Sequence, residues 1–177
     1  MITSDNKPYG LHRARDEKFF RGEKIVSLRK TAEPCFTYTD FDCYVSQSYN
    51  VIKTERFNLK FLTAVLNSNV IKFWLRYKGK MQGDNFQVDK EPLLELPLIV
   101  PTESEQAHLS VLADQMITAQ EQLGSAISDS DKKFLQQRVD ILDKQINTVV
   151  YGLYGLTADE VKVVEGDVGF EILIDNS

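Results

Sequence analysis

The spacing of hydrophobic residues between positions 24 and 53 indicates short strands. Four runs rich in β-branched and aromatic residues, KIVSLR, CFTYT, CYVS and YNVIK, are separated there by polar turn residues. Short runs of this kind, divided by turn material, are typical of antiparallel sheets. We therefore predict a small antiparallel or mixed sheet with strands at residues 24–29, 35–39, 43–46 and 49–53.

A helical spacing replaces the strand pattern after position 57. Asn58 precedes apolar residues spaced three or four apart and can cap a helix. The Asn-Ser-Asn sequence at 67–69 is predicted to separate this helix from a second one that carries Val70, Phe73 and Trp74. Residues 76–87 are then predicted to form a loop, and the apolar run 96–100 a strand closed by Pro101.

The second half of the chain shows two long apolar stripes at helical spacing. Thr102 and Glu105 form a capping-box pattern that predicts the start of the first helix. Gly124 and the SDSD sequence at 128–131 are predicted to end it, and a second helix follows. The apolar stripes comprise Leu109, Leu112, Met116, Ala119 and Leu123, and Leu135, Val139, Leu142, Ile146, Val149 and Leu153.

These two stripes predict an antiparallel helical hairpin. Each helix is expected to have about 19–20 residues, and a connection of about nine to ten residues makes them neighbours. Thr157 and Glu160 repeat the capping-box pattern for a short third helix, and residues 170–174 are predicted to be a last strand or an ordered tail. The expected fold class is α+β, with a sheet-containing subdomain at 1–101 and a helical hairpin subdomain at 102–177.

Composition places the chain among ordinary globular proteins. Hydrophobic residues make up 42% and charged residues 27% of its 177 positions. No apolar run approaches the roughly 20 residues that span a bilayer, and the first ten residues lack a signal-peptide pattern. We therefore predict a cytoplasmic protein with no membrane contact. Cys35 and Cys43 have no CxxC spacing and His12 and His108 lie far apart, so a metal site is not expected.

Charge is distributed unevenly along the chain. Residues 1–90 hold 16 Lys and Arg against 10 Asp and Glu, whereas residues 91–177 hold 5 against 16, and the whole chain has a net charge of −5. Residues 9–30 alone hold seven basic side chains. Such asymmetry indicates two parts with different partners and makes the basic part a candidate for nucleic acid, although a solvated charged face would have the same composition.

Sequence motifs for catalysis are scarce. The chain has no Gly-rich phosphate loop, no HExxH and no GxSxG. Glu160 and Lys162 have the E-x-K spacing of metal-dependent nucleases. They fall in the predicted third helix with no Pro-Asp strand upstream, so we interpret them as an ordinary helix end, and no catalytic residue is predicted.

Four segments in a fixed order carry a resemblance to a known family. They are KPYGLHRARD with FRGEKIVSLR, then LKFLTAVLNSNVIKFWL, then LLELPLIVPTESEQAHLSVLADQMI, and finally INTVVYGLYGLTADEV. Together they resemble the TaqI-like C-terminal specificity domain of type II restriction-modification enzymes. They are also similar to one target-recognition half of a type I specificity subunit. The match extends over nearly the whole chain.

The resemblance implies a module that recognises a short sequence in double-stranded DNA for an N6-adenine methyltransferase domain, in some enzymes fused to a nuclease. Such methyltransferases use S-adenosylmethionine and flip the adenine out of the duplex. Their Asn-Pro-Pro-Tyr motif is absent, since KPYG does not match it. We therefore expect no cofactor in this chain, with S-adenosylmethionine bound by a methyltransferase domain or subunit, predicted upstream of Met1 in a longer protein.

The candidate DNA-binding residues are basic and amide side chains in two regions. Lys and Arg neutralise phosphates, and Arg, Asn and Gln can bond to base edges. The leading region is the turn at 9–15 with the strand that follows, and the second is the loop at 76–87. The candidates are His12, Arg13, Arg15, Lys18, Arg21, Lys24, Arg29, Lys30, Lys78, Lys80, Gln82, Asn85 and Gln87.

Other interpretations of these residues remain open at this point. Arg29 could pair with an acidic residue across the sheet, and His12 could be a hydrogen-bonded turn residue. Phe19, Phe20, Trp74 and Phe86 are expected in the core rather than as stacking platforms. An alternative function is a non-catalytic interaction module whose basic half meets an acidic protein and whose hairpin forms a homodimer.

Overall fold

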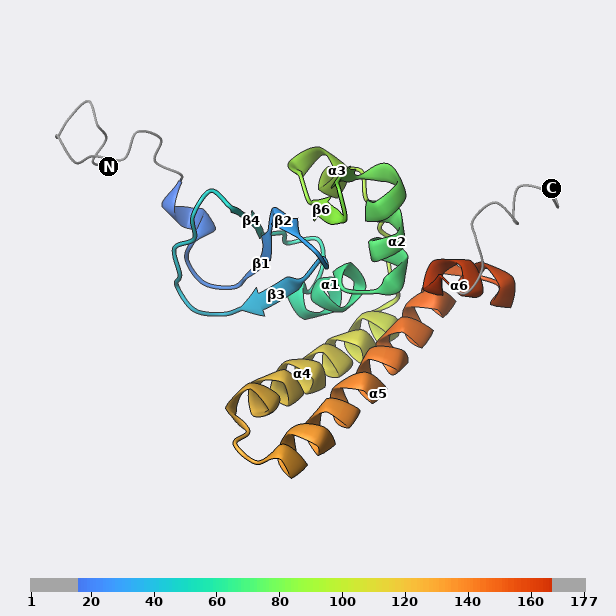
Figure 1. Cartoon of the computed structure of the whole chain (residues 1–177). Coiled ribbons are helices and arrows are strands. Elements are labelled where there is room, and N and C mark those ends of the chain that lie inside the picture. Colours follow the sequence, from blue (N-terminus) through green and yellow to red (C-terminus); the bar gives the residue numbers. More distant parts are fainter. Residues whose placement is uncertain (1–15, 167–177) are drawn as a thin grey trace.

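The computed structural model describes residues 16–166 and shows an α+β fold with two small antiparallel sheets and a long helical hairpin (Figure 1). The first sheet has the order β3 (Phe36–Thr39), β1 (Lys24–Leu28), β4 (Tyr49–Ile52). The second has the order β2 (Lys30–Thr31), β6 (Asn85–Gln87), β5 (Lys80–Gln82). The predicted fold class is therefore confirmed.

The first sheet contains three of the four predicted strands. β1 is central and pairs on one side with β3 and on the other with β4. The fourth predicted strand, at 43–46, is wrong, because the chain must cross from one edge of the sheet to the other between β3 and β4. In this crossing Cys43 N–H donates to the carbonyl of Phe20 at 3.0 Å, and the Asp42 carboxylate accepts from the N–H of Gly22 at 2.7 Å.

The predicted loop at 76–87 is instead the end of a helix followed by a β-hairpin. The second helix continues to Lys78, and β5 and β6 pair in antiparallel register, with Gln82 opposite Asn85. Gly83 and Asp84 form the turn. Gly83 has a φ of +61°, which a glycine adopts without strain and which a type II′ hairpin turn requires at its first central position.

Two consecutive helices support both sheets, as the Asn58 and Asn-Ser-Asn patterns predict. In α1 (Leu59–Leu66), the Asn58 side chain accepts from the N–H groups of Lys60 and Phe61 at 2.9 and 3.2 Å. α2 (Asn69–Lys78) begins after the break. The Asn67 side chain at the break bonds to both the N–H and the carbonyl of Phe36, at 2.9 and 2.7 Å, which ties α1 to the edge of β3.

The strand predicted at 96–100 is wrong, and a short helix, α3 (Lys90–Leu94), precedes this segment. Pro97 has no N–H to donate to a sheet, and the N–H of Leu98 already bonds to the carbonyl of Leu96 at 2.8 Å. Leu93, Leu96 and Leu98 pack against the core. Leu96 and Leu98 therefore cover the core from an irregular connection that has no strand partner among the described residues.

The hairpin consists of α4 (Glu103–Ser125) and α5 (Asp129–Tyr154), followed by α6 (Ala158–Glu165). Both capping boxes are present, with Thr102 and Glu105 at α4 and Thr157 and Glu160 at α6. The helix bounds differ from the prediction. Gly124 lies inside α4, and Ser128 accepts from Asp131 N–H at 3.1 Å and caps α5, so residues 126–128 alone connect helices of 23 and 26 residues.

The apolar stripes of α4 and α5 face each other, as the predicted hairpin requires, and form a seam between the two helices. Leu112, Leu142 and Ile146 are buried, whereas Met116 and Val149 are partly buried against the same core. The half of the hairpin near the sheets packs on α1 and α2, and the far half projects from the body (Figure 1). Among residues 16–166, no helix is both long and apolar enough to cross a membrane.

We expect Leu142→Ala to lower the free energy of unfolding by about 2–4 kcal/mol, because it removes a buried side chain and leaves a cavity in the seam. Ile141→Ala is the matched control, since Ile141 is its neighbour on α5 and is 57% exposed. Urea unfolding followed by circular dichroism measures both. Equal, small losses for the two variants would show that the seam is not tightly packed.

Candidate nucleic-acid interface

One face of the second sheet collects five of the predicted DNA-binding residues. β6 is central: Gln87 lies opposite Lys30 of β2 on one side and Lys80 of β5 on the other. Side chains alternate between the two faces of a strand. The residues at alternating positions on this face are Lys30, Lys80, Gln82, Asn85 and Gln87. The structure thus forms a row of two lysines and three amides from segments that are 50 residues apart in the sequence.

The opposite face of this sheet is anchored in the core. Phe86 lies opposite Thr31 and Met81 in the register and is 1% exposed. The guanidinium of Arg76 lies over the Phe86 ring, 5.7 Å from its centroid. This burial fixes which face of β6 is exposed, because a one-residue shift would place Gln87 in the core.

Arg29 lies at the junction between the two sheets. Its N–H donates to the Ser48 carbonyl at 2.8 Å, and its carbonyl accepts from the N–H of Val88 at 2.7 Å. The Asn50 side chain donates to the Val88 carbonyl at 2.8 Å from β4. These backbone bonds hold the Cα of Arg29 in place beside the exposed face of the second sheet.

Asp89 connects Arg29 to this face. Its two carboxylate oxygens accept hydrogen bonds from Arg29 Nη2 and from Gln87 Nε2, each at 2.8 Å. The bond from Arg29 is the main cause that holds the pKa of Asp89 below its usual range, against the effect of burial. The alternative that Arg29 pairs with an acidic residue is therefore confirmed, although half of its side chain stays exposed.

A shallow polar hollow of about 490 Å³ lies beside the row of lysines and amides. Four of the predicted residues line it, and Gln47 and Ser48 from the crossing between β3 and β4 complete its wall. Its lining residues are Leu28, Arg29, Lys30, Gln47, Ser48, Gln82, Gln87 and Asp89. The hollow therefore offers hydrogen-bond donors and acceptors next to the cationic side chains of Arg29 and Lys30.

The basic residues near the start of the described chain have acidic partners. Lys18 pairs with Asp16 at 3.1 Å, and Arg21 pairs with Glu17 at 2.6 Å and with Asp42 at 3.4 Å. These carboxylates offset the positive charge locally. Phe20 is buried as expected, but Phe19 is 39% exposed, so the prediction that Phe19 lies in the core is wrong.

Lys24 is completely buried in β1, and its ammonium donates to the carbonyls of Gly22 and Phe41. These bonds hold the start of β1 against the crossing to β4. A duplex could reach this ammonium only after the crossing had moved, so we assign Lys24 a structural role and leave it out of the interface proposed below.

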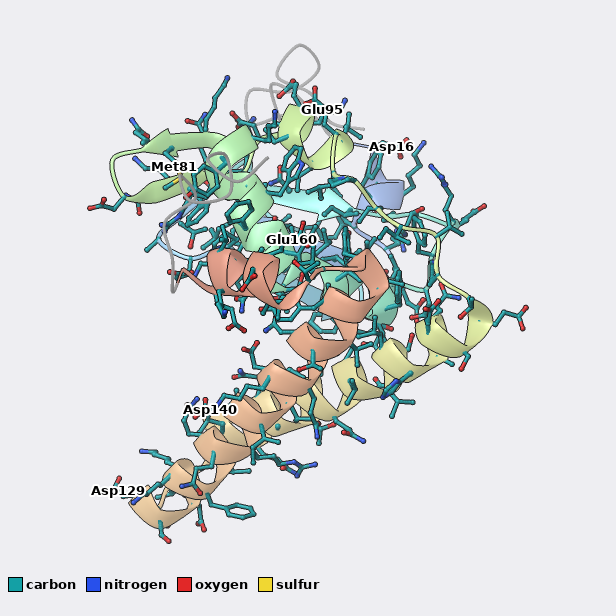
Figure 2. All side chains as sticks on the ribbon, turned by 90° about the vertical axis from the view of Figure 1, so that its right-hand side faces the viewer. Asp16, Met81, Glu95, Asp129, Asp140 and Glu160 are labelled. Carbon is teal, nitrogen blue, oxygen red and sulfur yellow. The ribbon has the colours of Figure 1, made fainter. Side chains whose placement is uncertain are left out.

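The two groups of candidate residues lie apart. Figure 2 shows Asp16, the partner of Lys18, and Met81, in β5, on opposite sides of the upper part of the molecule. Lys78, exposed at the end of α2, lies next to β5. His12, Arg13 and Arg15 lie outside the described residues.

Groups considered for metal chemistry are engaged in local bonds. The Glu160 carboxylate accepts from the N–H and hydroxyl of Thr157, at 2.7 and 2.8 Å, and Lys162 bonds to Asp159 at 2.8 Å. No group of three His, Cys, Asp or Glu side chains within residues 16–166 has metal-site geometry. Cys35 and Cys43 are free thiols.

The sequence patterns indicated neither the role of Asp89 nor the pairing of β2 with β6. The hairpin itself had a local signal, because Gly83 and Asp84 form a two-residue turn between matched triplets, a pattern typical of β-hairpins. Asp89 had no such signal, since Arg29 lies 60 positions away and only the fold brings it to the carboxylate that also accepts from nearby Gln87.

Comparison with known proteins supports a single family. The family model described as the TaqI-like C-terminal specificity domain matches residues 4–98, which is more than half of the chain and includes both sheets. A search of curated proteins found no match.

Proposed function

The chain belongs to the family of TaqI-like C-terminal specificity domains, and we propose that the exposed face of β2, β6 and β5 contacts duplex DNA. The family description indicates a role in DNA recognition in restriction-modification. The observation that carries this proposal is the row Lys30, Gln87 and Lys80 across three paired strands. Lysines neutralise phosphates and amides bond to base edges, and one surface presents both.

The shape of the β5–β6 hairpin supports the same proposal. The major groove of DNA admits a two-stranded β-ribbon, and several DNA-binding proteins insert one. In Figure 2 this hairpin, marked by Met81, projects to the left from the upper part of the molecule, whereas Asp129 and Asp140 mark the helical hairpin, which extends downward. This arrangement leaves the far half of the helical hairpin apart from the proposed DNA-binding face.

In this proposal a partner domain or subunit catalyses the methylation of DNA. An N6-adenine methyltransferase domain or subunit would bind S-adenosylmethionine and act on DNA that this chain recognises, in some enzymes together with a nuclease. The helical hairpin would serve as spacer and docking surface for that partner. Phe134 and Ile141, seven residues apart on α5 and 66% and 57% exposed, are among the exposed apolar side chains of the hairpin.

A second candidate function is an interaction module that forms a homodimer through the hairpin, and the same two exposed side chains favour it. Sedimentation of the full chain distinguishes the two. A monomer at micromolar concentrations would support the docking role, whereas a dimer lost in Phe134→Ser would support the homodimer.

Titration of a labelled duplex with the full chain at several salt concentrations tests DNA binding. We expect the logarithm of the affinity to fall with the logarithm of salt, with a slope of about −0.9 per phosphate contact. Polyglutamate is the control, because a surface that merely attracts acidic chains would bind it equally well. Absence of duplex binding, or equal binding of polyglutamate, would contradict the proposal.

A further inference from the structure

The orientation of the Gln87 side chain is set by the charge of Asp89. An ionised carboxylate has no hydrogen to donate, so the amide of Gln87 must turn its Nε2 toward Asp89 and its Oε1 away. Asp89 is 7% exposed and its other oxygen is held by Arg29. The depressed pKa of Asp89 keeps the carboxylate ionised at neutral pH. The amide is therefore held in one orientation before any ligand arrives.

The held amide has one acceptor and one donor left. Nε2 carries a second hydrogen, and Oε1 has free lone pairs. Among residues 16–166, no group other than Asp89 bonds to this amide. Gln87 lines the polar hollow and is partly exposed, so both groups can reach a ligand that enters there.

A single acceptor with a single donor selects among base edges. In the major groove adenine offers an acceptor at N7 beside a donor at N6, whereas guanine offers two acceptors, at N7 and O6. Cytosine offers a donor at N4, and thymine an acceptor at O4. Only adenine can accept from Nε2 and donate to Oε1 at the same time. We propose that Gln87, positioned by Asp89, binds the major-groove edge of one adenine in the target duplex.

The neighbours of Gln87 fit this role. Lys30 and Lys80 lie directly across the sheet on either side of it, so phosphate contacts from both would fix the height of the central amide over the groove. The inference rests on the proposed DNA-binding function of this face. It goes beyond that function in naming the base and in giving a buried carboxylate a positioning role.

Selection from a library of duplexes with a randomised segment tests the inference with the full chain. We expect the wild-type protein to enrich a motif that contains an A·T pair. Gln87→Ala should reduce the preference at that one pair by about 5- to 150-fold and leave the other positions unchanged. Asp89→Asn should weaken the preference at the same pair, because a neutral amide no longer fixes the orientation of Gln87. Gln137→Ala, an exposed glutamine on α5, is the matched control and should keep the wild-type motif.

A second measurement changes the DNA instead of the protein. Replacing the selected adenine by 7-deazaadenine removes the N7 acceptor and should weaken wild-type binding about 5-fold or more. The same replacement should have little effect on Gln87→Ala, which has already lost the donor. An equal effect on both proteins would overturn the assignment.

The outcomes separate this inference from the function on which it rests. If Gln87→Ala kept the wild-type motif, or altered a G·C pair, the adenine assignment would be wrong while DNA binding stood. If the wild-type protein bound duplexes with a salt-dependent affinity but enriched no motif, the assignment would also fail alone. If it bound no duplex at all, both proposals would fail together.

Discussion

Phe86→Ala is expected to lower the free energy of unfolding by about 3–5 kcal/mol, the largest effect on stability that we predict. Phe86 is 1% exposed and anchors the central strand of the second sheet. Its loss would leave a cavity beneath the strand that carries Gln87. The side chains of the candidate interface would then lose their common support, so DNA affinity should fall with stability.

Met81→Ala is the control for Phe86→Ala. Met81 is the register partner of Phe86 on β5 but is 37% exposed, so its replacement should cost about 0.5 kcal/mol or less. Urea unfolding of the three proteins gives both differences. Comparable losses for the two variants would mean that the sheet is not anchored through Phe86.

The double variant Lys30→Ala with Lys80→Ala is expected to weaken duplex binding roughly 60-fold at about 0.1 M salt, through the loss of two phosphate contacts. A phosphate contact contributes about −0.9 to the log-log salt slope, and two contacts contribute about −1.8. Between 1 M and 0.1 M salt, a slope of this size raises the affinity by roughly eightfold for each contact. Duplex titrations at several salt concentrations measure both the affinity and the slope.

Lys132→Ala with Lys133→Ala provides a control of equal charge. Both lysines are exposed near the start of α5, on the far part of the hairpin. Their removal changes the net charge by the same two units. Because these lysines lie far from the sheet face, the salt slope should stay within experimental error of the wild type. If both double variants lowered the affinity equally, the overall charge and not the sheet face would control binding, and the interface would have to be placed elsewhere.

The sequence was sufficient for features that depend on near neighbours. The Asn58 cap and the two capping boxes were predictable because the bonded groups lie two or three residues apart. The predictions failed where distant partners decide. An apolar run such as 96–100 becomes a strand only if another strand pairs with it, and the run at 43–46 lies where the chain must cross between sheet edges.

For the candidate interface too, the sequence indicated some features and the fold decided others. The residue types, the excess of basic side chains in the first half and the family resemblance were all present in the sequence and indicated DNA recognition. The sequence could not distinguish Lys24 from Lys30. Burial and hydrogen bonds decide this, since Lys24 bonds to two backbone carbonyls in the interior while Lys30 lies exposed beside Gln87.

The sequence by itself therefore determined the fold class and the antiparallel helical hairpin, because periodicity, capping and composition act over a few residues or over the whole chain. The family resemblance, also carried by the sequence, indicated a role in DNA recognition. Only the tertiary structure decided which side chains share a surface. Pairing of β2 with β6 joins residues more than 50 positions apart, and the bond from Arg29 to Asp89, which joins residues 60 positions apart, depends on the same long-range arrangement. The physical reason is that such contacts depend on the path of the backbone, which no local pattern specifies.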